Sequence, residues 1–426
     1  MDTKGDPIMN ARTRTLVAAT VLLGIVSGSA VAHAAPRGPV PPSGSVSLSV
    51  ASGSGPGSVS AGVAAPVFST APDAEALTKA LEGVGVGNAD ATAALIRVGG
   101  SSGSWRGASG VADLVGGRPA LEQGRFRAGS VTKTFTAAVV LQLAAEGKVD
   151  LDGPVQRYLP GTFPDRFPSV SVRELLNHTS GIKPADGPGD AFEAQWDHRF
   201  DVVDPHDQIA NALAKGPEFD PGSAQHYLNI NYTVLGVLIE KLTGTAYEEQ
   251  VDRRILRPLG LCQTSFPGRT RTRIPGPYNH GYQAVPRPDG STELRDVSVW
   301  NTSDRWAAGD IISTTADLER FTVALFGGRV VPRAQLEEMF TVPAVKDVES
   351  GKDAALTAGL SRIVMPDGTE VWGKTGSRFG YSTGMGGTRD LSRTLVYSVN
   401  STDAKGKGMN PVVGKLLAAA LTRPRP

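Results

Sequence analysis

The helix that begins at Ser130 constrains this chain more than any other feature of its sequence. Ser130 precedes Lys133 by three residues, and apolar side chains then recur with helical spacing until Gly147 (Val131, Phe135, Ala138, Val139, Leu141, Leu143 and Ala144). Residues three apart share one face of a helix, so the Ser130 hydroxyl and the Lys133 amine can meet. A serine nucleophile needs this geometry from a lysine that acts as its base.

A second string of the same form, Ser180 to Lys183, lies in a turn context. It is flanked by His178-Thr179 and by Pro184, and no helix is predicted there to align its two ends. We therefore expect Ser130, not Ser180, to be the nucleophile.

The pair Tyr227-x-Asn229 lies on one side of a short extended segment, before a helix predicted to start at Asn231. The phenol can shuttle a proton, and the amide can hold a substrate carbonyl or orient the lysine. The alternative is a tyrosine that only packs against the following helix.

The triplet Lys374-Thr375-Gly376 ends a predicted strand. Glycine there lets a substrate approach the strand edge, while Lys374 and Thr375 can receive a carboxylate or stabilise developing negative charge. The alternative is a solvated lysine on an edge strand.

Charge and metal-ligand patterns narrow the function classes. The chain has 43 basic and 42 acidic residues, with no basic run, so we expect no nucleic-acid partner. No H-E-x-x-H or paired-cysteine string occurs, so we expect neither a metal nor another cofactor. The single cysteine, Cys262, cannot form an internal disulfide, and we expect it to be a small buried hydrophobe. We interpret His178, His226 and His280 as buried, hydrogen-bonded side chains.

The first 34 residues have the three parts of an export signal: basic Arg12 and Arg14, an apolar stretch over 16–26, and an A-x-A site that ends at Ala34. The apolar stretch is short for the alternative, a membrane anchor. We predict cleavage after Ala34 and a secreted, extracellular protein without a stable membrane anchor. The start codon is Met1 or Met9.

Residues 35–72 are rich in Gly, Ser, Pro and Ala and are predicted to form a flexible spacer, followed by one domain over 73–426. Its predicted helices are 74–81, 172–176, 207–213, 232–242 and 411–421, and its predicted strands are 93–98, 105–114, 361–365, 370–375, 384–389 and 393–400. Terminal strands and helices thus bracket a helical middle at about 164–320. This pattern indicates one α/β domain with a helical insertion.

S-x-x-K, Y-x-N and K-T-G, in this order, resemble the motifs of the penicillin-recognising serine hydrolases over about residues 73–420. The S-D-N box of class A β-lactamases is absent. The string Ser398-x-Asn400 has a similar form, but it follows Lys374 and is therefore out of order. The chain is therefore similar to the branch with class C β-lactamases and secreted D-alanyl-D-alanine carboxypeptidases. The resemblance implies an antiparallel sheet flanked by helices, with a helical insertion.

The resemblance also implies roles for the site residues. Ser130 would form an acyl-enzyme, Lys133 would be its base, and Tyr227 would protonate the leaving amine. Backbone N–H groups of Ser130 and Ser377 would form the oxyanion hole. The substrate-binding residues would be Asn229, Lys374, Thr375, Gly376 and Trp306, with core packing as the alternative for Trp306. Asp310 stands where relatives usually have a small or apolar residue and is expected to alter the pocket wall.

We expect from this resemblance a secreted, monomeric D-alanyl-D-alanine carboxypeptidase that acts on cell-wall peptides of peptidoglycan. A class C-like β-lactamase, an esterase or a D-amino-acid amidase is the alternative, with a small peptide or β-lactam as substrate. Secreted carboxypeptidases often have histidine in place of Lys374, so the third box does not choose between peptidase and lactamase. A non-catalytic wall- or antibiotic-binding protein is a further alternative, but it would not need this full set of residues.

Overall fold

The computed structural model describes residues 65–423 except residue 190. The predicted signal peptide, the two alternative starts and most of the predicted spacer lie outside the described residues.

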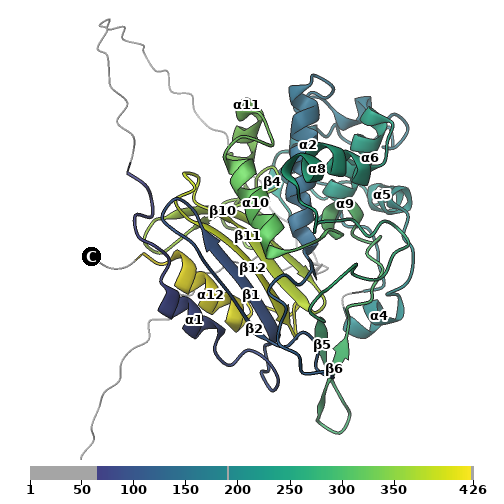
Figure 1. Ribbon diagram of the computed structural model, residues 1–426. Coiled ribbons are helices and arrows are strands. Elements are labelled where there is room, and N and C mark those ends of the chain that lie inside the picture. Colours follow the sequence, from purple (N-terminus) through teal and green to yellow (C-terminus); the bar gives the residue numbers. More distant parts are fainter. Residues whose placement is uncertain (1–64, 190, 424–426) are drawn as a thin grey trace, which may run out of the picture.

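A six-stranded antiparallel sheet organises the chain, in the order β2-β1-β12-β11-β10-β9 (Figure 1). Its strands are β1 (Ala91–Gly99), β2 (Trp105–Gly110), β9 (Ser361–Val364), β10 (Glu370–Arg378), β11 (Tyr381–Gly387) and β12 (Thr394–Ser401). The short strands are β3 (Phe126–Arg127), β4 (Ala224–Gln225), β5 (Tyr282–Pro286), β6 (Thr292–Asp296), β7 (Ile312–Ser313) and β8 (Lys346–Asp347).

The α-helices are α1 (Ala74–Leu81), α2 (Thr132–Ala145), α3 (Val172–Leu176), α4 (Phe192–Asp197), α5 (Pro205–Ala214), α6 (Asn229–Thr243), α7 (Tyr247–Val251), α8 (Arg257–Leu259), α9 (Trp306–Gly309), α10 (Thr315–Phe326), α11 (Arg333–Leu336) and α12 (Pro411–Leu421). A single 3₁₀ turn, η1 (Gly129–Val131), leads directly into α2. None of the helices in the described part of the chain is long and apolar enough to cross a membrane.

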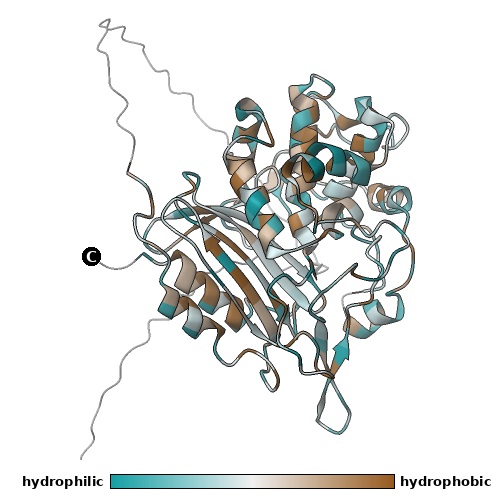
Figure 2. Cartoon of the chain, viewed as in Figure 1, coloured by the Kyte–Doolittle hydropathy of each residue, from teal (hydrophilic) through white to brown (hydrophobic). Residues whose placement is uncertain are grey.

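Helices cover both faces of the sheet, because its strands are apolar on both sides. Along β1, Leu95 faces the larger core with α2 and α6, while Ala94 and Ile96 face the smaller core with α1 and α12. Figure 2 shows apolar residues on β1 and α12 and also along α2. The structure confirms the predicted α/β class, with an antiparallel sheet flanked by helices.

Several predictions about local structure are wrong. Strand β2 ends at Gly110 rather than at residue 114, and β11 begins at Tyr381 rather than at residue 384. Helix α6 begins at Asn229 rather than Asn231, because the chain leaves its extended conformation at Leu228. Strand β10 runs on to Arg378, since pairing with β11 continues to its last residue, opposite Tyr381. Cys262 is exposed, because the chain turns after α8 and buries Leu261 instead.

Candidate active site

The turn η1 and the first turn of α2 bring Ser130 and Lys133 together. The Lys133 Nζ lies 3.3 Å from the Ser130 Oγ, and it donates to the Asn229 Oδ1 (2.7 Å) and to the Ala308 carbonyl oxygen (2.8 Å). These last two oxygens can only accept hydrogen bonds. A neutral amine would satisfy both with its two N–H groups and keep its lone pair for the Ser130 hydroxyl.

The surroundings of Lys133 favour that neutral amine. Its side chain is fully buried on the inner side of α2. Burial, followed by the charges of Lys374, Arg305 and Lys405, lowers the pKa of Lys133 well below its ordinary value. The arrangement thus supplies a base within reach of the serine.

Two lysines lie over the Tyr227 ring, with the Nζ of Lys133 4.9 Å and the Nζ of Lys374 4.7 Å from its centroid. Burial raises the pKa of Tyr227, outweighing the opposite effects of Ser130 and Arg305. Among the described residues, its hydroxyl has no partner that meets hydrogen-bond geometry. The phenol is therefore protonated and free to pass a proton between groups that approach it.

The third motif lies on the part of β10 that extends beyond its pairing with β9. Lys374 is buried, which lowers its pKa to about 7, and its Nζ donates to the Thr375 carbonyl oxygen (3.0 Å). It is therefore not a solvated edge lysine.

Gly129 brings the Ser130 turn against β10. A Cβ atom built on Gly129 would lie 2.7 Å from the Ser377 nitrogen and 2.9 Å from the Ser377 oxygen. The N–H groups of Ser130 and Ser377 therefore come from two segments in backbone contact, and Gly376 packs even more closely on the Ala128 carbonyl oxygen.

Two residues considered for the pocket lie in the core instead. Trp306 is buried against Tyr247, and its Nε1 donates to the Glu248 Oε1 (2.8 Å). Trp306 therefore packs in the core, which was the alternative to binding substrate. Asp310 is also fully buried and does not line the cavity described below, so the expectation that it alters the pocket wall is wrong. Burial and Glu248 raise the pKa of Asp310 well above its ordinary value, which favours a neutral acid.

The second S-x-x-K string does not form a pair. The Ser180 hydroxyl donates to the Asn231 Oδ1, whereas the Lys183 Nζ donates to the Lys215 carbonyl oxygen. The nearby His178 is buried, accepts from Asn231 and packs on the Tyr227 ring, with 4.7 Å between centroids. His178 thus helps to position Tyr227.

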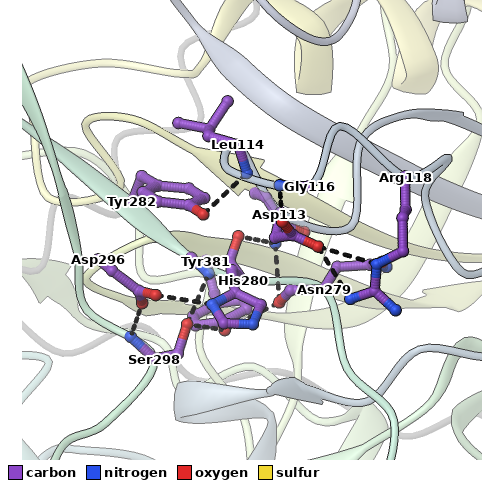
Figure 3. A network of polar contacts seen from close by, with 12 residues as sticks. Asp113, Leu114, Gly116, Arg118, Asn279, His280, Tyr282, Asp296, Ser298 and Tyr381 are labelled. Carbon is purple, nitrogen blue, oxygen red and sulfur yellow. Dashed lines mark hydrogen bonds and ion pairs between the residues drawn. The ribbon is translucent and has the colours of Figure 1, made fainter.

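The other two histidines are hydrogen-bonded to carboxylates, as expected, but they are only partly buried rather than buried. The Nδ1 of His226 contacts the Glu218 Oε2 (2.7 Å) at the rim of the cavity. Figure 3 shows the Nδ1 of His280 against the Asp296 Oδ2 (2.6 Å) in a polar network whose labelled residues include none of the predicted site residues.

A cavity of about 690 Å³ opens beside Tyr227 and Asn229. Sequence reasoning missed the charged residues of its wall, which are Asp186, Asp201, Lys215, Asp304, Arg305, Glu349 and Lys405. Lys405 belongs to the loop after β12, where the Nζ of Lys405 donates to the Ser377 carbonyl oxygen (3.1 Å). No motif or periodicity marks that loop. Within the described residues, no group of three or more His, Cys, Asp or Glu side chains is placed to hold a metal ion.

The arrangement of Ser130, Lys133 and Tyr227 agrees with comparisons to known proteins. The profile of the family described as Beta-lactamase matches residues 82–418. The chain belongs to the β-lactamase family. As expected from its motifs, it is a serine hydrolase of the group that includes the penicillin-binding proteins.

Two curated members of the family are similar to parts of the chain. Penicillin-binding protein 4* of Bacillus subtilis is 30% identical over 306 residues, which cover 69% of this chain and 64% of the relative. Esterase EstB of Burkholderia gladioli is 35% identical over 208 residues, which cover 44% of this chain and 52% of the relative. The chain thus spans between half and two thirds of the length of these two relatives.

Solved structures of family members match over more of their length. A D-stereospecific amidohydrolase from Streptomyces superposes with a TM-score of 0.70 at 35% identity, covering 82% of this chain and 99% of that protein. The D-amino acid amidase from Ochrobactrum anthropi gives a TM-score of 0.66 at 25% identity, covering 81% of this chain and 98% of that protein.

Proposed function

We propose that this chain cleaves an amide bond of a D-amino-acid substrate through an acyl-enzyme on Ser130. The observation that carries the proposal is the environment of the buried Lys133. Its amine donates to two oxygens that can only accept, and its pKa is lowered, so its lone pair is left for the serine hydroxyl. Similarity to a D-stereospecific amidohydrolase over nearly its whole length supports the D-configuration.

In the proposed acylation, Lys133 takes the proton of Ser130 while the Oγ bonds to the substrate carbonyl carbon. The carbonyl electron pair moves to the oxygen, which the N–H groups of Ser130 and Ser377 would stabilise. Such a donor typically contributes about 100- to 1000-fold to the rate. The C–N bond then breaks, and the proton on Lys133 reaches the leaving amine through the Tyr227 hydroxyl.

Deacylation reverses these roles. A water molecule gives its proton to the Tyr227–Lys133 pair and attacks the ester carbon, and the Ser130 Oγ recovers a proton as it leaves. Asn229 would hold the amide group of the acyl portion, and Lys374 and Thr375 would face a carboxylate of the leaving portion.

A D-alanyl-D-alanine carboxypeptidase acting on cell-wall peptides is our specific candidate within this class, supported by similarity to a penicillin-binding protein. We also propose that the protein acts outside the cell, as the predicted signal over residues 1–34 implies. Sequencing the N-terminus of protein recovered from the medium tests that part: a start at Ala35 agrees with it.

The test compares the D- and L-forms of N-acetyl-phenylalanine p-nitroanilide, a peptide ending in D-alanyl-D-alanine, a chromogenic β-lactam and a short ester. Ser130→Ala is the inactive control, and Ser180→Ala is the matched control at the second string. We expect D-amide or D-peptide turnover that Ser130→Ala abolishes. Equal turnover of the L-amide, or amide turnover retained by Ser130→Ala, would contradict the proposal, while turnover of the β-lactam or ester alone would move it to those alternatives.

A further inference from the structure

Three basic side chains gather around Asp304 at the wall of the cavity. The Nε of Arg305 lies 3.2 Å and the Nη1 of Arg378 3.5 Å from the Asp304 Oδ2. The charges of Arg305, Arg378 and Asp304 all act on the pKa of Lys405. Since one carboxylate faces three bases, this cluster has an excess of positive charge among the described residues. The other acids of the cavity wall are each paired with a base of the same wall: Asp186 with Lys215, Asp201 with His198, and Glu349 with His226.

The cluster lies next to the proposed oxyanion hole. The Ser377 oxygen accepts from the Lys405 Nζ, and the Ser377 nitrogen and oxygen both face Gly129. The ammonium group of Lys405 is therefore bound to the same residue whose N–H is proposed to stabilise the reacting carbonyl oxygen.

The order of residues along β10 assigns the cluster to one half of the substrate. Lys374 and Thr375, proposed for the leaving portion, come before Ser377, and Arg378 comes after it. Asn229, proposed for the acyl portion, lines the same cavity as Arg305 and Lys405. The cavity therefore lies on the acyl side of the scissile bond.

We propose that this cavity binds the acyl portion of the substrate and that Arg305 and Lys405 select acyl portions that carry a carboxylate. The inference rests on the proposed function and narrows it to one substrate class. A substrate with a free α-ammonium group would meet the excess positive charge. The competing possibility, an ammonium bound by the Asp304 Oδ1, which has no partner within the described residues, predicts the opposite preference.

The experiment uses three p-nitroanilides of D-phenylalanine that differ in the charge of the acyl portion. The N-succinyl group is an anion. Its methyl ester, called the methylsuccinyl substrate below, is neutral with the same chain, and the free amine is a cation. We expect kcat/KM for the succinyl substrate to exceed that for the methylsuccinyl substrate by about 10-fold or more, because hydrogen bonds to charged groups are strong. The free amine should be the poorest substrate.

Lys405→Met should remove most of this preference, whereas Lys405→Arg should retain it. Lys407→Met is the matched control, because Lys407 is an exposed lysine of the same loop. Burial, together with Arg305 and Arg378, lowers the pKa of Lys405 to about 7. The preference in kcat/KM, which reports the free enzyme, should therefore decrease as the pH rises through 7.

Three results would each overturn this inference but not the proposed function. They are equal rates on the succinyl and methylsuccinyl substrates, a preference for the free amine, and a preference for succinyl that Lys405→Met leaves intact. Lack of turnover of every D-anilide, with the protein folded, would overturn the proposed function and the inference with it. Thermal melting of each variant distinguishes loss of the fold from loss of selectivity.

Discussion

Gly129→Ala tests whether close contact between the Ser130 turn and β10 builds the oxyanion hole. The new methyl carbon would lie 2.7 Å from the Ser377 nitrogen, whereas ordinary contacts begin at 3.4 Å. Both partners are backbone, so the two segments must separate by about 0.7 Å. Misplacing a reacting group by about 1 Å costs about 100-fold in rate, and losing an oxyanion donor costs about 100- to 1000-fold. We expect kcat to fall by about 100-fold.

The same substitution also strains the backbone, because Gly129 has φ +52°. A left-handed alanine costs about 1–2 kcal/mol, and overpacking adds about 1–3 kcal/mol. Gly147→Ala is the matched control, since Gly147 follows the same helix with φ +69° and has no atom within 4 Å of its Cβ position. It should lose stability from strain alone and keep its kcat.

The assay is kcat for the best D-amide substrate, measured well below the melting temperature and corrected by active-site titration. A kcat for Gly129→Ala within about three-fold of the wild-type value would refute this reasoning, because the crowded contact would then not set the position of the Ser377 N–H.

Three further changes test the electrostatics and the packing of the site. Asp310→Asn should raise the melting temperature by about 2 °C or more at pH 8 but not near pH 3. The raised pKa of Asp310 means that the folded state favours the protonated acid and loses stability as the pH rises, a loss that asparagine avoids. Calorimetry that shows a lower melting temperature for the variant at pH 8 would contradict this. Lys374→Met should move the acid limb of kcat/KM to higher pH, since the charge of Lys374, next to burial, lowers the pKa of Lys133; an unmoved limb would show that the charge of Lys374 does not lower this pKa. Ser180→Ala should keep kcat within about three-fold but lose about 1–3 kcal/mol in denaturant unfolding, because the buried hydroxyl pairs with Asn231; a full loss of turnover in folded protein would make Ser180 a catalytic candidate.

The sequence was informative wherever function depends on local spacing. The i, i+3 relation of Ser130 and Lys133 predicted their contact, although Ser130 lies in the 3₁₀ turn η1 and helix α2 begins only at Thr132. The strands of the sheet were likewise predicted from local patterns. The error at Cys262 has the opposite cause, since one cysteine in a turn has no periodic pattern to indicate which way it faces.

The cavity wall could not be predicted, because it depends on contacts between distant segments. Lys405 lies in an irregular loop and reaches Ser377 only because β12, β11 and β10 pair side by side. Arg305 belongs to another segment, just before α9. No local pattern relates these two residues, although both act on Lys133.

The motif alone does not make Lys133 a base. A lysine at the same spacing on an exposed helix would have a pKa of about 10.4 and would remain charged. Here α2 is buried against α6 and α9, and the carbonyl of Ala308 from α9 accepts one hydrogen bond from the amine. Reactivity therefore depends on packing that excludes water from Lys133, so a cavity in this part of the core should slow acylation even where no site residue is changed.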